Sequence, residues 1–124
     1  MEVLSVCEEP NLIEKARRSW RIIRDFQAGI DYEINDIRAA LVDLRDALSE
    51  LRVITATSGR LQGAEKFAEE FSGVISHIIN NLDAALLGVE ILSKETIRAW
   101  LALMLYGIDM EAVLTLFAFI LRPF

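Results

Sequence analysis

A long series of apolar positions, spaced alternately three and four residues apart, constrains the fold of this chain more than any other feature. It comprises Ile13, Ala16, Trp20, Ile23, Gln27, Ile30, Ile34, Ile37, Leu41, Leu44, Leu48 and Leu51, of which Ala16 and Gln27 are the small and polar exceptions. This spacing places side chains on one stripe of an α-helix, whereas the alternation typical of β-strands is absent. The stripe therefore predicts an all-α chain with a coiled-coil-like first helix.

Taken as one element, the stripe predicts a helix over residues 10–54, preceded by an N-terminal tail over residues 1–9. Pro10 suits the first turn of a helix, where its missing N–H would have no partner. At 1.5 Å per residue such a helix is about 65 Å long, so it must protrude or pair with something. The tripeptide Gly29-Ile30-Asp31 occurs again as Gly107-Ile108-Asp109, and we expect a turn at this second occurrence. Because the heptad phase is preserved across Gly29, we favour continuity there, with at most a bend at 29–31.

Turn-forming residues at 55–60 separate this helix from a second one, which we expect over residues 61–91. Two long helices joined by a short loop form an antiparallel helical hairpin. Small residues in the second helix, namely Gly73, Ala84, Ala85 and Gly88, either let another helix approach closely or accommodate local packing.

Two short apolar helices are expected after the hairpin, over residues 94–106 and 110–121. Ser93 and Asp109 are typical of the position before the first helical turn, and Gly107 is typical of the position after the last. With 124 residues, the whole chain (1–124) is expected to form a single all-α domain, a helical bundle.

The segment 97–121 is the most apolar part of the chain. Ten uncharged residues lie between Arg98 and Asp109, and ten more lie between Glu111 and Arg122. Each run is shorter than the roughly 20 residues that a membrane-spanning helix needs. Joining the runs would place two carboxylates inside the bilayer, so a span is disfavoured and a shallow membrane contact through 97–121 is the membrane alternative.

A helix that is apolar on all sides must be buried on all sides, and a chain of this size encloses few such positions. We therefore expect a non-enzymatic structural or interaction subunit that forms a homo-oligomer or joins an obligate protein complex. The residues expected at its interface are Trp20, Ile30, Ile34, Ile37, Leu41, Leu44, Leu48, Leu51, Trp100, Leu103, Leu114, Phe117 and Phe119.

The composition excludes much catalytic machinery. Cys7 is the single cysteine and His77 the single histidine, which excludes an internal disulfide and any metal site with two imidazoles. A net charge of −6 disfavours nucleic-acid binding. We infer no catalytic residue, cofactor, metal or small-molecule substrate, and without a secretory signal pattern we expect the cytoplasm.

His77 carries the only resemblance to a known family. It lies in Ser76-His77-Ile78-Ile79-Asn80-Asn81, followed by a stripe of Leu, Ala and Gly. This stretch of about twenty residues resembles the phospho-accepting helix of sensor-kinase dimerisation and histidine-phosphotransfer domains, although Ile78 replaces the usual acidic residue. The resemblance implies that His77 accepts a phosphoryl group and that Asn81 orients it. The alternative is a packed histidine hydrogen-bonded to Glu70 or Asn81.

Arginines recur at multiples of seven residues beside the stripe, at Arg17, Arg24, Arg38, Arg45 and Arg52. Such positions favour ion pairs between helices. We expect their partners among Glu65, Glu69 and Glu70, or among acidic residues of another copy.

Overall fold

The computed structural model describes residues 2–122, and the side chains of residues 11–122. Within that part the chain is all-α, as predicted, and it forms a helical bundle. Its helices are α1 (Glu2–Gln27), α2 (Ile34–Thr57), α3 (Glu65–Ile91), α4 (Lys94–Met104) and α5 (Met110–Leu121).

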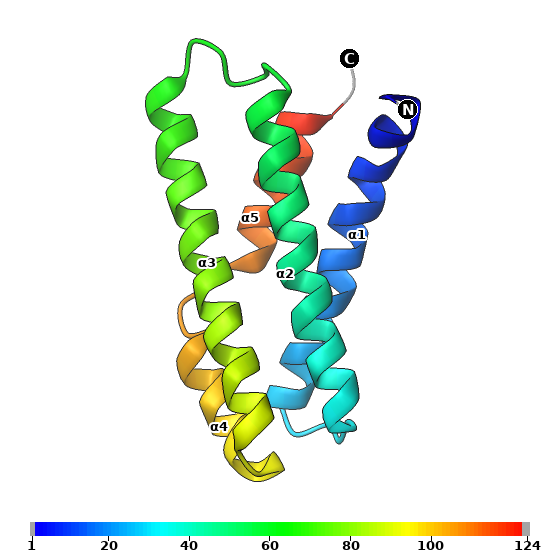
Figure 1. Cartoon of the computed structure of the whole chain (residues 1–124), viewed down its shortest axis with the longest axis vertical. Helices are drawn as coiled ribbons and strands as arrows, with labels where there is room; N and C mark the ends of the chain where they lie inside the picture. Colours follow the sequence, from blue (N-terminus) through cyan, green and yellow to red (C-terminus); the bar gives the residue numbers. More distant parts are fainter. Residues whose placement is uncertain (1, 123–124) are drawn as a thin grey trace.

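The helices form four antiparallel columns, and the fourth column consists of α4 followed by α5 (Figure 1). Helix α1 packs on α2 and α2 packs on α3, while α4 packs on α3 and α5 returns to α1. The loop between α2 and α3 therefore lies at the same end of the bundle as the last turn of α5 (Figure 1). This arrangement encloses one hydrophobic core that draws side chains from all five helices.

The continuous helix predicted over residues 10–54 is wrong, because the chain reverses direction between α1 and α2. Gly29 adopts φ 108°, a conformation that costs glycine little. The N–H of Ile30 donates to the carbonyl of Asp25 (3.0 Å) and that of Gly29 to the carbonyl of Phe26 (3.1 Å). These two bonds form a Schellman motif, which satisfies the last carbonyls of a helix as it ends. Gly29 thus terminates α1 instead of bending it.

The reversal explains how the long apolar stripe is buried within the chain itself. Its first half on α1, including Ile13 and Ile23, and its second half on α2, including Leu41 and Leu48, are buried in the same core. Both halves of the apolar stripe therefore face the same core inside the chain.

The N-terminal tail predicted over residues 1–9 is also wrong, because α1 begins at Glu2 and continues through Pro10. Proline removes one backbone hydrogen bond and bends a helix without having to end it. The preference of proline for a first turn was therefore a misleading start signal here.

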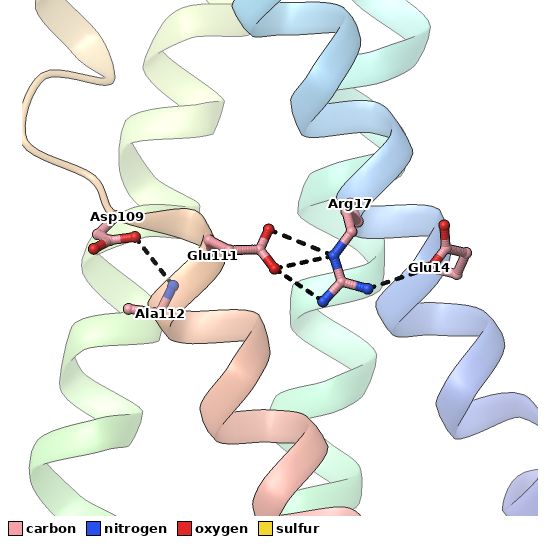
Figure 2. A network of polar contacts seen from close by, with 5 residues as sticks. All are labelled: Glu14, Arg17, Asp109, Glu111 and Ala112. Carbon is pink, nitrogen blue, oxygen red and sulfur yellow. Dashed lines mark hydrogen bonds and ion pairs between the residues drawn. The ribbon is translucent and has the colours of Figure 1, made fainter.

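The later helices follow their sequence signals more closely. Helix α5 has the bounds predicted for 110–121, and Asp109 caps it by accepting from the N–H of Ala112 (3.0 Å; Figure 2). Ser93 caps α4, which ends at Met104, two residues before the predicted bound of 94–106. Helix α3 begins at Glu65 instead of residue 61, because the turns at Gly59 and Gly63, both with positive φ, lengthen the loop.

Candidate functional site

The residues predicted to form an interface divide into three groups in the structure. Three are exposed, namely Ile30 (52%), Leu103 (69%) and Phe119 (64%), and three are half-buried, namely Trp20, Ile34 and Trp100. The other seven lie in the core of the chain itself, where they have no surface to offer a partner, which corrects their assignment to an interface between chains. They are Ile37, Leu41, Leu44, Leu48, Leu51, Leu114 and Phe117.

Most exposed large apolar side chains belong to the C-terminal half of the chain. Among the described residues ten large apolar side chains are exposed, and eight of these ten belong to α3, α4, α5 and the connection between α4 and α5. We call these eight residues the apolar surface: Phe67, Val74, Leu87, Ile91, Leu103, Tyr106, Leu116 and Phe119. Six of them were absent from the predicted interface, which included only Leu103 and Phe119 of this set.

The composition of α4 and α5 had led us to expect that both helices would be buried on all sides. This expectation is wrong, because each of them has an exposed face in the structure. On α5 one face, including Val113 and Phe117, packs into the core, whereas the opposite face carries Phe119, which is 64% exposed. On α4 the corresponding pair is Leu101, which is buried, and Leu103. Beyond Glu111 the exposed face of α5 carries no charged side chain, so polarity does not distinguish it from the buried face.

An ion-pair network fastens α5 to α1 (Figure 2). Arg17 on α1 donates through Nε to Glu111 on α5 (3.1 Å) and through Nη1 to Glu14 (3.3 Å). The hydrogen bond to Glu111 raises the pKa of Arg17, against the opposing effect of burial. All three side chains are partly exposed, so the network positions α5 more than it stabilises the bundle.

The heptad arginines of α2 form a regular ladder with α3. Arg38 pairs with Glu90 (2.7 Å) and Arg45 with Asp83 (3.2 Å), while Arg52 donates to the hydroxyl of Ser76. Both members of each rung step by seven residues in opposite directions, as antiparallel helices require. The expectation of ion pairs between helices is confirmed at Arg17, Arg38 and Arg45 but not at Arg24 and Arg52, for which the described part of the chain holds no such pair. The partners expected at Glu65, Glu69 and Glu70 are wrong, because the longer loop shifts the register of α3.

His77 is exposed on α3. Among the contacts found in the described part of the chain, none is a hydrogen bond from His77 to Glu70 or Asn81. The hydrogen-bonded histidine that was the alternative to phosphorylation is therefore not observed, and neither is the predicted orientation by Asn81. Cys7 lies outside the side chains that the structure describes.

A small cavity lies where α2 ends and α3 begins. It has a volume of about 70 Å³, and its walls include Phe71, Ile75 and Phe117 together with Arg52 and Thr55. The rings of Phe71 and Phe117 lie 4.9 Å apart at a tilt of 59°. Thr55 is 6% exposed, and its hydroxyl is, among the described side chains, the buried polar group without a hydrogen-bond partner. Leaving such a group unpaired costs about 1–3 kcal/mol.

One helix of the described chain, α3, is long and apolar enough to cross a membrane, by length and composition only. In the structure 39% of its most apolar window is buried inside the bundle. Helix α5 is apolar but shorter.

Comparison of the chain with protein-family models, with curated proteins and with solved structures finds no match.

Proposed function

We propose that this protein is a non-enzymatic structural subunit that self-associates, and that its apolar surface packs against a second copy of the chain. The observation that supports this is that eight of the ten exposed large apolar side chains of the described chain belong to α3, α4, α5 and the connection between α4 and α5. Exposed apolar side chains concentrated in this way are typical of interaction sites. Burial of one large apolar side chain contributes about 1.5–3 kcal/mol, so a few of these residues suffice for association.

Charge favours protein over membrane as the occupant of this surface. Residues 65–122 contain eight acidic and four basic side chains, a net charge of −4. Cytoplasmic membrane surfaces are negatively charged and attract basic segments, so they repel this one. Insertion of α3 itself would break the ladder and bring Asp83 and Glu90 into hydrocarbon.

Charge also favours a second copy as that protein. Arg18, Arg21 and Arg24 are exposed on α1, and none of them makes an ion pair with an acidic side chain in the described part of the chain. This basic face complements the acidic half that carries the apolar surface. In this arrangement α1 of one copy contacts α3, α4 and α5 of the next.

Absolute mass in solution, measured without detergent over a range of concentrations, tests the proposal. We expect an oligomer that dissociates when Leu103 and Phe119 are replaced together by Ser. Val53→Ser is the matched control, because Val53 is 57% exposed but lies on α2, outside the apolar surface. A wild-type chain that stays monomeric at about 100 μM, or equal effects of the control and the double variant, would contradict self-association. Binding to vesicles that Leu103→Ser and Phe119→Ser abolish would support the membrane alternative.

The exposure of His77 favours a second candidate function, phosphoryl transfer through a helical bundle. A phospho-accepting histidine must be reachable by another protein, and this one is. Incubation with acetyl phosphate would label the wild-type chain and leave His77→Gln unlabelled. Equal labelling of the two proteins, or none of either, would dismiss this candidate.

A further inference from the structure

Helix α3 carries a stripe of side chains that α4 covers at one end only. Trp100 of α4 packs against Ala84 and Gly88, where its indole donates to the carbonyl of Ala84 (3.0 Å). Alternating steps of three and four residues along a helix stay on the same side of it. From Ala84 such steps lead back to Asn81, His77, Val74, Glu70 and Phe67. The last four are exposed, and we call them the open stripe: Phe67, Glu70, Val74 and His77.

The open stripe is uncovered because the second half of the fourth column packs elsewhere. Helix α4 ends at Met104, and α5, which continues the column, packs mainly on α1 and α2. The ring contact between α5 and α3 joins Phe117 to Phe71, and both of these side chains belong to the core. Phe67 (41% exposed) and Val74 (50%) therefore form an apolar seam that the described part of the chain leaves open.

The charges around the open stripe are mainly acidic. Residues 65–70 carry three glutamates and one lysine, a net charge of −2. All four side chains are exposed, and within the described part of the chain none of them forms an ion pair. A partner of this stripe therefore needs a helix or strand with unpaired basic side chains.

The basic face of α1, formed by Arg18, Arg21 and Arg24, has the complementary charge. With Asp25 it gives residues 18–25 a net charge of +2, and no ion pair satisfies these four side chains among the described residues. At 1.5 Å per residue the arginines span about 9 Å of α1, and the glutamates of residues 65–70 span about 7.5 Å of α3. The two charged segments therefore match in length as well as in sign.

We propose that the open stripe of α3 binds the basic face of α1 of a second copy. The aliphatic stems of the arginines cover Phe67 and Val74, while their guanidinium groups meet Glu65, Glu69 and Glu70 at the rim. This assignment rests on the self-association proposed above and adds which two helices meet. A membrane does not fit the same stripe, because anionic headgroups repel its glutamates.

Charge reversal in the full chain tests the assignment. Arg18→Glu with Arg21→Glu, and separately Glu69→Arg with Glu70→Arg, should each weaken association about tenfold or more, because like charges then face each other. Asp36→Arg with Glu50→Arg is the matched control. It changes the net charge as much as the Glu69 and Glu70 reversal does, at exposed positions of α2 outside both faces, and should leave association unchanged. Analytical ultracentrifugation over a range of concentrations measures all three.

Mixing the two reversed variants gives the sharper result. The acidic α1 of one variant then meets the basic α3 of the other, and the unchanged faces also match. An equimolar mixture should therefore associate within about threefold of the wild-type affinity. The two variants have net charges of −10 and −2, so general attraction between the chains does not explain such a rescue. Rescue also excludes misfolding as the reason why each variant fails alone.

The outcomes separate this assignment from self-association itself. A wild-type chain that stays monomeric would contradict self-association and the assignment together. A wild-type oligomer that neither reversal weakens, that the α2 control weakens equally, or whose reversed variants do not associate when mixed would overturn only the pairing of α1 with α3.

Discussion

The indole of Trp100 lies so close to Gly88 that a β-carbon built on the glycine would stand 2.1 Å from the indole nitrogen. That nitrogen donates to the carbonyl of Ala84 (3.0 Å), one turn earlier on α3. The aromatic ring of α4 thus lies directly on the backbone of α3. Of the two alternatives expected at Gly88, the structure therefore shows local packing, in which the glycine accommodates a side chain of another helix of the same chain.

Replacement of Gly88 by Ala should therefore destabilise the bundle. The added methyl would displace the indole and its hydrogen bond, and overpacking of this kind typically costs about 1–3 kcal/mol. Gly73→Ala is the matched control, because Gly73 lies on the same helix and nothing stands within 4 Å of its added β-carbon. Since alanine favours helix by about 0.5–1 kcal/mol over glycine, the control should be stabilising. Urea unfolding followed by circular dichroism measures both, and equal shifts in the two variants would contradict this packing.

The ladder between α2 and α3 predicts a measurable coupling between Arg38 and Glu90. Arg38→Glu should destabilise the protein by placing two carboxylates together, and adding Glu90→Arg should restore most of the loss. Because the two side chains are 36% and 56% exposed, the coupling free energy should be about 0.3–1 kcal/mol and should fall with added salt. A double-mutant cycle in urea measures it, with Arg38→Glu combined with Glu95→Arg as the mismatched control. Equal rescue by both second substitutions would mean that the register of the ladder is incorrect.

The sequence was sufficient to predict those features that depend on local chemistry. Asp109 and Ser93 cap the helices that they were expected to cap, and the bounds 110–121 are confirmed. Each feature is decided within one turn of the backbone, so no knowledge of the rest of the fold was required. Ion pairs from the heptad arginines could also be predicted, although their partners could not, because heptad positions lie beside a helix seam whatever the partner is.

The reversal at Gly29 could not be decided from spacing. Heptad spacing places apolar residues on one stripe in a long helix and equally in an antiparallel hairpin, and Ile30 keeps the phase although it lies in the turn and is 52% exposed. The repeat of Gly-Ile-Asp at residues 107–109 was the informative signal, because Gly29 and Gly107 both lie with positive φ in the turn that follows a helix. The partners of the ladder and the exposed faces of α4 and α5 depended in turn on tertiary packing that local patterns do not encode.

Gly29 should therefore be required for the reversal itself. Gly29→Ala places a β-carbon on a residue with φ 108°, and we expect destabilisation of about 1–2 kcal/mol. Gly29→Asn is the graded control, because asparagine tolerates positive φ better than alanine and should cost less. Thermal or urea unfolding at low protein concentration gives the comparison. Alanine as stable as glycine at this position would argue for a different backbone conformation.

Asp31 and Lys94 connect the α1–α2 turn to the first residue of α4, and their pairing should make the stability of this contact depend on acid. The hydrogen bond from Lys94, with its positive charge, holds the pKa of Asp31 below its ordinary value of 3.8. The unfolded chain binds this proton more readily than the folded one, so the pairing contributes its full stability above about pH 4 and loses it as the pH falls through the lowered pKa. Carbon NMR of the Asp31 carboxyl measures that pKa directly. Lys94→Met should return the pKa of Asp31 toward 3.8, whereas Lys66→Met, which removes a charge elsewhere, should leave this pKa unchanged. An Asp31 pKa of 3.8 in the wild-type chain would mean that the two side chains do not pair in solution.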